Sequence, residues 1–331
     1  MKKFKGFVVL LAIMLVLSAC GKGSSQKSDG DSGDQVVLLT NADEEAVNAW
    51  KETLDEAGYE GKYIIQSLAT SELGGKLMAE GKTIQADLIT MSTYFLQSAQ
   101  DKHEMFADLS FETKAIEEHP SYYLPILGNT GAIFVNTEVM KANNLPVPAS
   151  IKDLTDPVYE GFVSIPNITD SSTAWLMVQA VIDAYGEEEG QEVLEKLVKN
   201  VGPHLESSGS GPIKKVQSGE VALGFGLRHQ AVIAQESGAP IEFIDPVEGN
   251  FSLTEAVAVV NKESGHNELA MEMAEVLMND SRAKMIDFYP VALYEGESVD
   301  SVFEPAYSKS FPEPLTVELL EKHQAFFNAA K

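Results

Sequence analysis

Short apolar runs alternate with stretches of helical periodicity along most of this 331-residue chain. Residues 36–40 form a nearly continuous apolar run, as expected for a strand buried on both faces, and apolar side chains then recur at helical spacing over 46–57. The same order repeats, with strands predicted at 63–65 and 87–90 and a helix over 71–81 between them. This alternation predicts a mostly parallel sheet covered by helices.

A second series of strands and helices follows a stretch that is interrupted by Pro146, Pro148 and Pro157. The same two patterns, short apolar runs and helical spacing, place the remaining elements. The predicted strands lie at 131–136, 162–166, 221–225, 241–244 and 256–260, and the predicted helices at 172–185, 188–200, 213–218 and 269–278. From residue 36 onward, about 300 residues of ordinary apolar content are enough for a sizeable core and favour about two domains.

The first twenty residues have the pattern of a processing signal. Three lysines precede an apolar run over 7–17, which is shorter than the ~20 residues that a helix needs to cross a bilayer. Such a run is typical of a signal peptide, predicted here over 1–19. It ends in Leu-Ser-Ala-Cys at 17–20, which resembles the bacterial lipobox, so Cys20 is the expected lipidation site. The alternative is an ordinary secretory peptide, but Cys20 is the only cysteine, which excludes an internal disulfide.

A polar segment follows the cysteine. Residues 21–35 contain no apolar side chain, which is typical of a flexible tether, so 20–35 are predicted to hold the lipidated cysteine and its tether. After residue 17 no apolar stretch is long enough for a transmembrane helix, so the lipid on Cys20 is the only expected membrane attachment. The expected location is the extracellular face of the cell membrane, or the periplasm in a Gram-negative cell; the long tether favours a Gram-positive surface.

Charge and motifs narrow the class of function. A formal net charge of −26 opposes binding to nucleic acid. The six histidines are scattered without an H-E-x-x-H pair, and neither a G-x-S-x-G elbow nor a P-loop occurs. We therefore expect no metal site and no cofactor, and a binding protein rather than an enzyme. An exported enzyme with a triad assembled in space is the remote alternative.

Small hydroxyl, amide and acidic side chains gather where the predicted strands end and helices begin. Open α/β sheets bind ligands at the carboxyl ends of their strands, where helix N-termini offer free N–H groups. The candidates are Asn41, Asp43, Ser71, Glu72, Ser92, Thr93, Asn129 and Thr130 from the first half, and Asp170, Ser171, Ser172, Thr173 and Ser208 from the second. Each has an ordinary alternative role as a helix cap.

Charged and aromatic side chains add to these candidates. Arg228 follows a predicted strand and could clamp a phosphonate or carboxylate through two parallel hydrogen bonds, although a surface arginine is the plain alternative. Asp43, Glu72 or Glu255 could receive a ligand amine, although most such acids are simply solvated. Possible aromatic walls, with core packing as the alternative, are Tyr94, Tyr122, Tyr123 and Tyr289.

The order of several segments resembles the extracellular solute-binding proteins of ABC importers, in the branch with ferric-iron, thiamine and 2-aminoethylphosphonate binders. Four stretches carry this resemblance: SELGGKLMAEGK followed by QADLIT, GNTGAIFVNTEVM, SGEVALGFGLRHQA, and IEFIDPVEGNFSLTEAVAVVN followed by HNELAMEMAEVLMND. The resemblance implies a type II periplasmic-binding-protein fold, in which two α/β lobes joined by two crossing segments close on a ligand in the cleft between them.

In this chain the resemblance implies one lobe at 36–135 plus 255–331 and the other at 136–254, with the crossings near 135–137 and 250–254. It also implies a monomer that delivers its solute to an ABC permease and the permease's ATPase. A surface adhesin or a sensor would share the fold.

The resemblance leaves several ligands open. The first expectation is a small polar oxyanion-bearing solute, such as 2-aminoethylphosphonate or a related organophosphonate. Ferric-iron members carry a tyrosine pair after the strand that corresponds to 222–225, where this chain has Arg228 and no tyrosine. Ferric iron is therefore an alternative, as are thiamine and polyamines.

Overall fold

The computed structural model describes residues 35–331, except residue 112. The predicted signal peptide, the lipidation site Cys20 and the tether up to residue 34 lie outside these residues. Within the described part of the chain, no helix is both long and apolar enough to cross a membrane.

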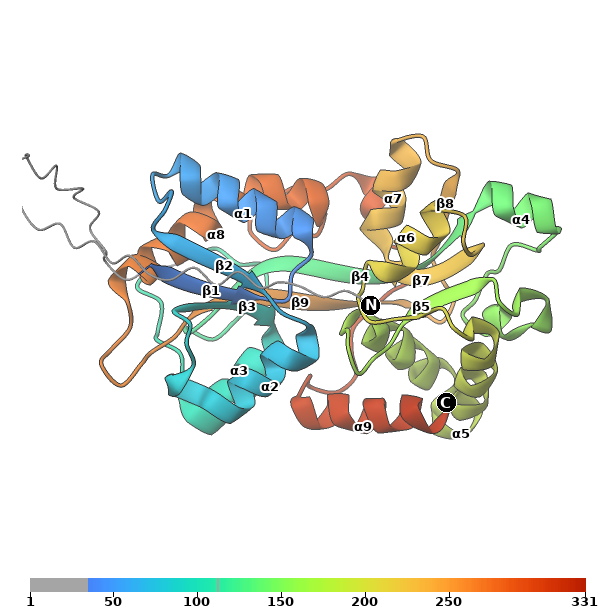
Figure 1. Cartoon of the computed structure of the whole chain (residues 1–331), viewed down its shortest axis with the longest axis horizontal. Coiled ribbons are helices and arrows are strands. Elements are labelled where there is room, and N and C mark those ends of the chain that lie inside the picture. Colours follow the sequence, from blue (N-terminus) through green and yellow to red (C-terminus); the bar gives the residue numbers. More distant parts are fainter. Residues whose placement is uncertain (1–34, 112) are drawn as a thin grey trace, which may run out of the picture. The chain divides into compact units, whose positions relative to one another are not determined.

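Ten strands of the described residues form one sheet (Figure 1). Along its main path the order is β2-β1-β3-β9-β4-β7-β5-β6, with β8 paired to β4 and β10 paired to β9. The strands are β1 (Val36–Thr40), β2 (Tyr63–Ser67), β3 (Leu88–Ser92), β4 (Leu124–Asn136), β5 (Val163–Pro166), β6 (Leu205–Glu206), β7 (Leu223–Leu227), β8 (Ile241–Ile244), β9 (Asn250–Val259) and β10 (Ser308–Lys309).

The two ends of the sheet are parallel, as predicted. At one end β1 pairs in parallel with β2 and β3, and at the other β5 pairs in parallel with β6 and β7. The middle is antiparallel, because β9 runs against both β3 and β4, and β4 runs against β7. The apolar runs of β1, β3 and β9 are almost wholly buried, which explains why they lack the polar alternation of a solvated strand.

The long strands β4 and β9 connect the two ends. β4 pairs with β9 as far as Thr130, which lies opposite Ser252, and pairs with β7 from Gly131 onward. The two crossing segments expected from the resemblance, near 135–137 and 250–254, therefore fall at the end of β4 and at the start of β9. By its contacts, however, the chain from 34 to 331 forms one compact unit. The division into lobes at 36–135 plus 255–331 and 136–254 stays a prediction.

Helices cover both faces of the sheet (Figure 1). They are α1 (Glu44–Glu56), α2 (Thr70–Glu80), α3 (Thr93–His103), α4 (Thr137–Asn143), α5 (Thr173–Val201), α6 (Gly211–Gln217), α7 (Arg228–Glu236), α8 (Glu268–Phe288) and α9 (Val317–Ala329). At the end that holds β1 to β3, α1 and α8 lie on one face and α2 and α3 on the other; at the opposite end, α6 and α7 lie on one face and α5 and α9 on the other (Figure 1).

One predicted helix break is confirmed, and one predicted helix end differs from the structure. The predicted helices 172–185 and 188–200 are the two halves of α5, which are separated by a break at Gly186, whose φ of 70° only glycine adopts readily. The helix predicted to end at 278 continues as α8 to Phe288. The Ser281 hydroxyl donates to the Leu277 carbonyl one turn earlier, and Arg282 pairs with Glu297, so polar residues there extend the helix instead of ending it.

Candidate functional site

The loop between β1 and α1 supplies the first polar groups of the candidate site. Asn41 donates to Thr70 at 3.1 Å and to Glu255 at 3.4 Å, while its own carbonyl oxygen is buried and accepts no hydrogen bond among the described residues. Asp43 precedes α1, yet its side chain makes no cap hydrogen bond. It accepts from Gln230 of α7 at 3.3 Å instead. The capping role that is the ordinary alternative for Asp43 is therefore not the one it has.

Glu255 supplies a carboxylate from the middle of the sheet. It lies on β9 opposite Ser92 of β3 and Leu127 of β4, and it is only 4% exposed. Its Oε2 atom has no hydrogen-bond partner among the described residues. Burial, with the charge of Asp43 as the second cause, raises the pKa of Glu255 to about 7. This carboxylate lacks the donors that a buried charge requires.

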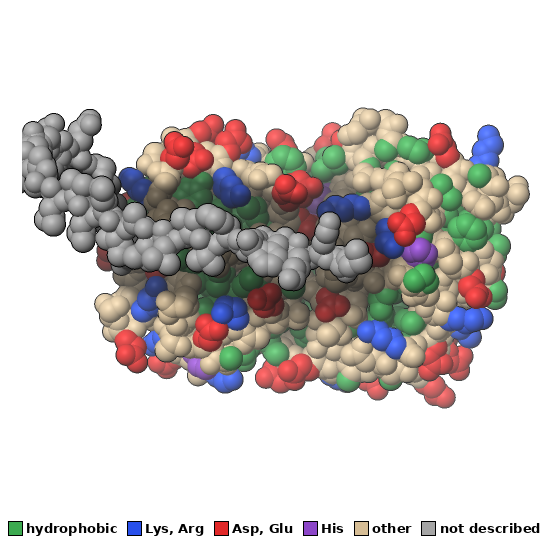
Figure 2. All heavy atoms as spheres, viewed as in Figure 1, with side chains coloured by type: hydrophobic (Ala, Val, Ile, Leu, Met, Phe, Trp, Pro, Cys, Tyr) green, Lys and Arg blue, Asp and Glu red, His purple; other side chains and the backbone are tan. Residues whose placement is uncertain are grey.

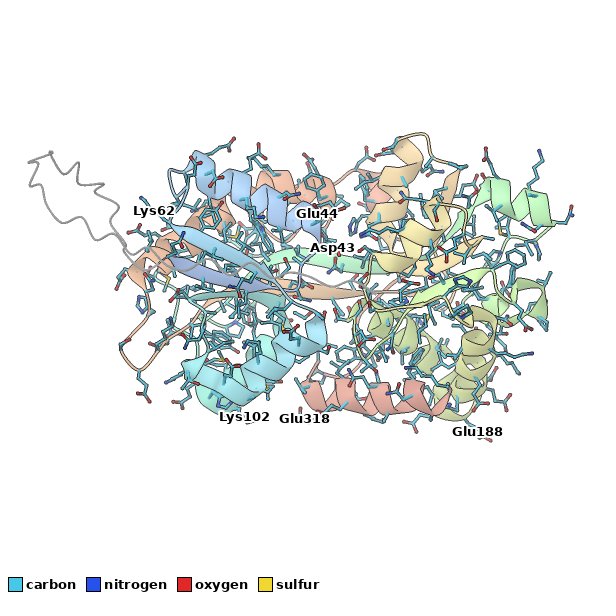
Figure 3. The ribbon with its side chains drawn as sticks, viewed as in Figure 1. Asp43, Glu44, Lys62, Lys102, Glu188 and Glu318 are labelled. Carbon is cyan, nitrogen blue, oxygen red and sulfur yellow. The ribbon has the colours of Figure 1, made fainter. Side chains whose placement is uncertain are left out.

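Asp43 carries the second carboxylate of this group, which Figure 3 shows at the start of α1. Burial and the charge of Glu45 raise its pKa, while a hydrogen bond from Ser210, the charge of Lys214 and the hydrogen bond from Gln230 oppose this rise. The carboxylates of Asp43 and Glu255 therefore lie near each other, and Asp43 receives more hydrogen bonds from protein donors than Glu255 does.

The start of α5 forms the opposite wall. Ser171, Ser172 and Thr173 are all buried, and Ser172, at the N-cap position, makes no cap hydrogen bond. Asp170 accepts from Asn167 at 2.6 Å. The chain at Gly209 passes so close that a Cβ there would lie 2.3 Å from the Thr173 hydroxyl. Only glycine allows this approach, which places Ser207 and Ser208 beside the hydroxyls of α5.

Together these groups enclose a cavity of about 270 Å³. This is slightly below the ~300–1,000 Å³ that is usual for ligand sites, as expected for a small solute. The lining residues are Asn41, Ala42, Asp43, Leu68, Ala69, Thr70, Leu127, Asn129, Asp170, Ser171, Ser172, Thr173, Ser207, Ser208, Gly209, Leu227, Glu255 and Tyr289.

Among the described residues, the charged side chains that line the cavity are all acidic. Figure 2 shows acidic side chains spread over the visible face, with lysines and arginines among them. The cavity lining within the described chain instead holds three acidic residues and no lysine or arginine. The carbonyl oxygens of Asn41 and Asn129 and the Oε2 atom of Glu255 are buried there without a donor. Each such unpaired acceptor costs about 1–3 kcal/mol, so the site is suited to a ligand that donates hydrogen bonds and carries positive charge.

The structure brings some of the predicted residues together and leaves others apart. Those that line the cavity are Asn41, Asp43, Asn129, Asp170, Ser171, Ser172, Thr173 and Ser208. Those that do not are Ser71, Glu72, Ser92, Thr93, Thr130 and Arg228. Ser71 and Glu72 are exposed on α2, Ser92 is buried in β3, and Thr130 bonds to the Ser252 hydroxyl at 2.8 Å. Among the tyrosines proposed as walls, Tyr289 lines the cavity.

The structure directs Arg228 away from the cavity. Its guanidinium donates to both carboxylate oxygens of Asp245, at 2.8 and 3.1 Å, and to the Val302 carbonyl at 2.8 Å. It also lies 4.3 Å from the centre of the Phe243 ring. The arginine is 4% exposed and does not line this cavity. It is therefore not the surface residue of the alternative interpretation, and its role as a ligand clamp stays a prediction. It is half of a buried ion pair.

Several lining residues had little sequence signal. Leu68 and Leu227 are apolar residues at strand ends, Leu127 is an apolar residue inside β4, and Thr70 stands one position before the predicted Ser71. The sequence presents Glu255 only as one of several acids that could receive an amine. Its signal is its position directly before the apolar run 256–260, because an acid that continues a buried strand is unusual.

A metal centre finds little support in this geometry. Among the described residues, no group of three or more His, Cys, Asp or Glu side chains is arranged to hold a metal ion. Tyr289 is the one tyrosine of the cavity lining. Its pKa is raised by burial and by the charges of Asp43 and Glu255, which disfavours the phenolate that a hard trivalent ion prefers.

The sequence profile described as bacterial extracellular solute-binding protein matches residues 81–305. An uncharacterised protein of Haemophilus influenzae is 35% identical over 130 residues, which are 39% of this chain and 36% of that protein. The spermidine/putrescine-binding periplasmic protein of Salmonella typhimurium is 24% identical over 219 residues, 60% of each chain. The matches thus span between about a third and three-fifths of these curated relatives.

Solved structures extend the likeness to the whole fold. A periplasmic thiamin binding protein superposes with a TM-score of 0.71 at 17% identity, covering 95% of this chain and 98% of that one. At this identity the likeness concerns the fold alone. It confirms the predicted α/β fold of the type II periplasmic binding proteins.

Proposed function

The chain belongs to the bacterial extracellular solute-binding proteins, and from this premise we propose that it captures a small amine-bearing solute and delivers it to an ABC permease. Members of this family bind a solute and are not enzymes. The observation that carries the proposed ligand class is the cavity lining, in which Asp43, Asp170 and Glu255 stand among unpaired acceptors without a lysine or arginine.

An ammonium group matches this lining in charge and in hydrogen bonding. It offers three donors and no acceptor, and it can meet the unpaired oxygens of Asn41, Asn129 and Glu255. A polyamine has this chemistry at each end, and the relative from Salmonella typhimurium is described as a spermidine/putrescine binder. Thiamine would bring a fixed positive charge instead. Both stood as alternatives in the sequence analysis and now rank first.

The phosphonate expected first from the sequence is less well supported. The hydroxyls of Ser171, Ser172 and Thr173 could still receive an oxyanion at the start of α5. However, Asp170 adjoins them, and Arg228, the expected counter-charge, is engaged by Asp245. 2-Aminoethylphosphonate remains in the candidate set because of its amine. Ferric iron ranks below it, since Tyr289 is the one cavity tyrosine.

The cavity also supports capture by closure. Asn41, Asp43 and Glu255 come from the predicted first lobe, whereas Ser171, Thr173 and Ser208 come from the predicted second. A ligand that touches both groups would favour the closed form by its differential affinity. The permease would then recognise the closed surface.

Calorimetry on the delipidated protein tests the ligand class. We expect saturable binding of putrescine, spermidine or thiamine, weaker binding of 2-aminoethylphosphonate, and none of ethylphosphonate, the matched ligand without an amine. The reason is that only the amines supply donors and positive charge to the carboxylates. Tight binding of ferric citrate, with no response to any amine, would overturn the proposal.

The lipid anchor is proposed from the lipobox around Cys20. Replacing Cys20→Ala in the exporting cell is expected to abolish incorporation of a radiolabelled fatty acid and to shift the protein from the membrane fraction to the soluble one. The lipid is the only expected attachment, so the shift should be almost complete. Membrane retention of the variant would count against this anchor.

A further inference from the structure

Glu255 is set in the sheet without the partners that a buried carboxylate requires. It lies on β9, between β3 and β4, and its side chain forms part of the cavity wall. Its Oε1 atom accepts one long hydrogen bond of 3.4 Å from Asn41, and its Oε2 atom accepts none among the described residues. An ionised carboxylate in this position would be costly.

The groups that face Glu255 increase this cost. Asp43, at the start of α1, places a second carboxylate near it. Two tyrosines also lie near it, Tyr94 of α3 and Tyr289 directly after α8, and the negative charge of Glu255 raises the pKa of both phenols. Ser92 on β3 and Asn41 beyond β1 are neutral. Lys214 lowers the pKa of Asp43, but among the described residues no lysine or arginine lowers the pKa of Glu255.

We propose that the empty cavity keeps a proton on Glu255, and that the ammonium group of the solute expels this proton when it binds. This inference rests on the proposed ligand class. In the exchange, the Glu255 carboxylic acid loses its proton to solvent and becomes a carboxylate, and the solute's ammonium group takes the place of the proton as the positive partner. No covalent bond forms between protein and solute.

The sign of the pH dependence follows from this exchange. The pKa of Glu255 is raised to about 7 by burial and by Asp43. Above that pH the carboxylate is ionised in the empty protein, and the solute binds without competition. Below it the solute must displace a proton, so the affinity should fall about tenfold for each pH unit of acidification. Acidification would therefore release the solute.

Calorimetry in buffers of different ionisation enthalpy measures the exchange. With putrescine or spermidine as the probe, the slope of the binding enthalpy against the buffer enthalpy gives the protons released. We expect about one proton near pH 6 and close to none near pH 8.5. Glu255→Gln should release none at either pH. Glu242→Gln, which removes an exposed carboxylate on β8, should behave as the unmodified protein.

Infrared spectroscopy provides a readout that needs no ligand. Near pH 6 the empty protein should show a protonated-carboxyl band that is absent in Glu255→Gln and present in Glu242→Gln. Binding of an amine without proton release would overturn the exchange but leave the proposed ligand class intact. Failure of every amine to bind would overturn both. Loss of the band in Asp43→Asn, with its retention in Glu255→Gln, would assign the proton to Asp43 instead of Glu255 and refute the proposal.

Discussion

Replacing Arg228→Met is expected to lower the free energy of unfolding by about 3–5 kcal/mol, while amine affinity stays within about twofold of the original value. The ion pair with Asp245 is buried, the two side chains being 4% and 10% exposed. Methionine keeps much of the side-chain length but leaves the carboxylate without its bidentate partner. The effect on affinity is small because Arg228 does not line the cavity. Urea denaturation and calorimetry measure the two quantities.

Two further variants separate charge from packing. Lys199→Met removes an exposed cation paired with Glu160 at 3.5 Å and should cost less than about 1 kcal/mol. Adding Asp245→Asn to Arg228→Met should recover part of the lost stability. Asparagine removes the unpaired charge and keeps one of the two acceptor oxygens, to which Asn250 and the Ala306 N–H separately donate in Asp245. If Arg228→Met remained stable but lost affinity for 2-aminoethylphosphonate more than tenfold, the arginine would be a ligand clamp after all.

The sequence predicted several strands of the sheet from their short apolar runs. The run at 36–40 coincides with β1, which is almost wholly buried, and the run at 241–244 coincides with β8, in which only Ile241 is buried. The helix α3 was missed. Its sequence, TYFLQSAQDKH, begins directly where β3 ends, so no loop separates the two patterns. β4 was predicted only from residue 131, because its first half contains Pro125 and Gly128.

The candidate site was predictable as a set of strand ends but not residue by residue. Asn41 and Ser171 follow the carboxyl ends of β1 and β5, in the two parallel parts of the sheet, whereas Asn129 lies within β4, the long strand that connects these parts. Sequence gives no sign of which cap-position side chains actually cap. Nor does it indicate where Arg228 points, because its partner Asp245 lies seventeen residues away, beyond β8. The acidic character of the cavity becomes evident only in the folded chain, because Asp43, Asp170 and Glu255 are far apart in the sequence.

Replacing Asp43→Asn is expected to weaken amine binding about 100-fold, because removing one partner of a buried, hydrogen-bonded charge pair costs about 2–5 kcal/mol. Asparagine preserves shape and can still accept from Gln230, the donor at 3.3 Å. Glu44→Gln is the matched control: it removes an exposed carboxylate one residue along, in the first turn of α1, and does not line the cavity (Figure 3). Calorimetry should show unchanged affinity for that variant.

The stability of the empty protein distinguishes a ligand-binding role of Asp43 from a structural one. A carboxyl whose pKa is raised on folding favours the fold below its unfolded pKa and loses that contribution as the pH rises through the folded value. The pKa of Asp43 is raised by burial and by the charge of Glu45, and the charge of Asp43 in turn raises the pKa of Glu255. Asp43→Asn should therefore stabilise the empty protein at neutral pH while it weakens binding. A variant that lost stability and affinity together would show that Asp43 holds α1 to α7, and the cavity carboxylates would no longer account for the choice of ligand.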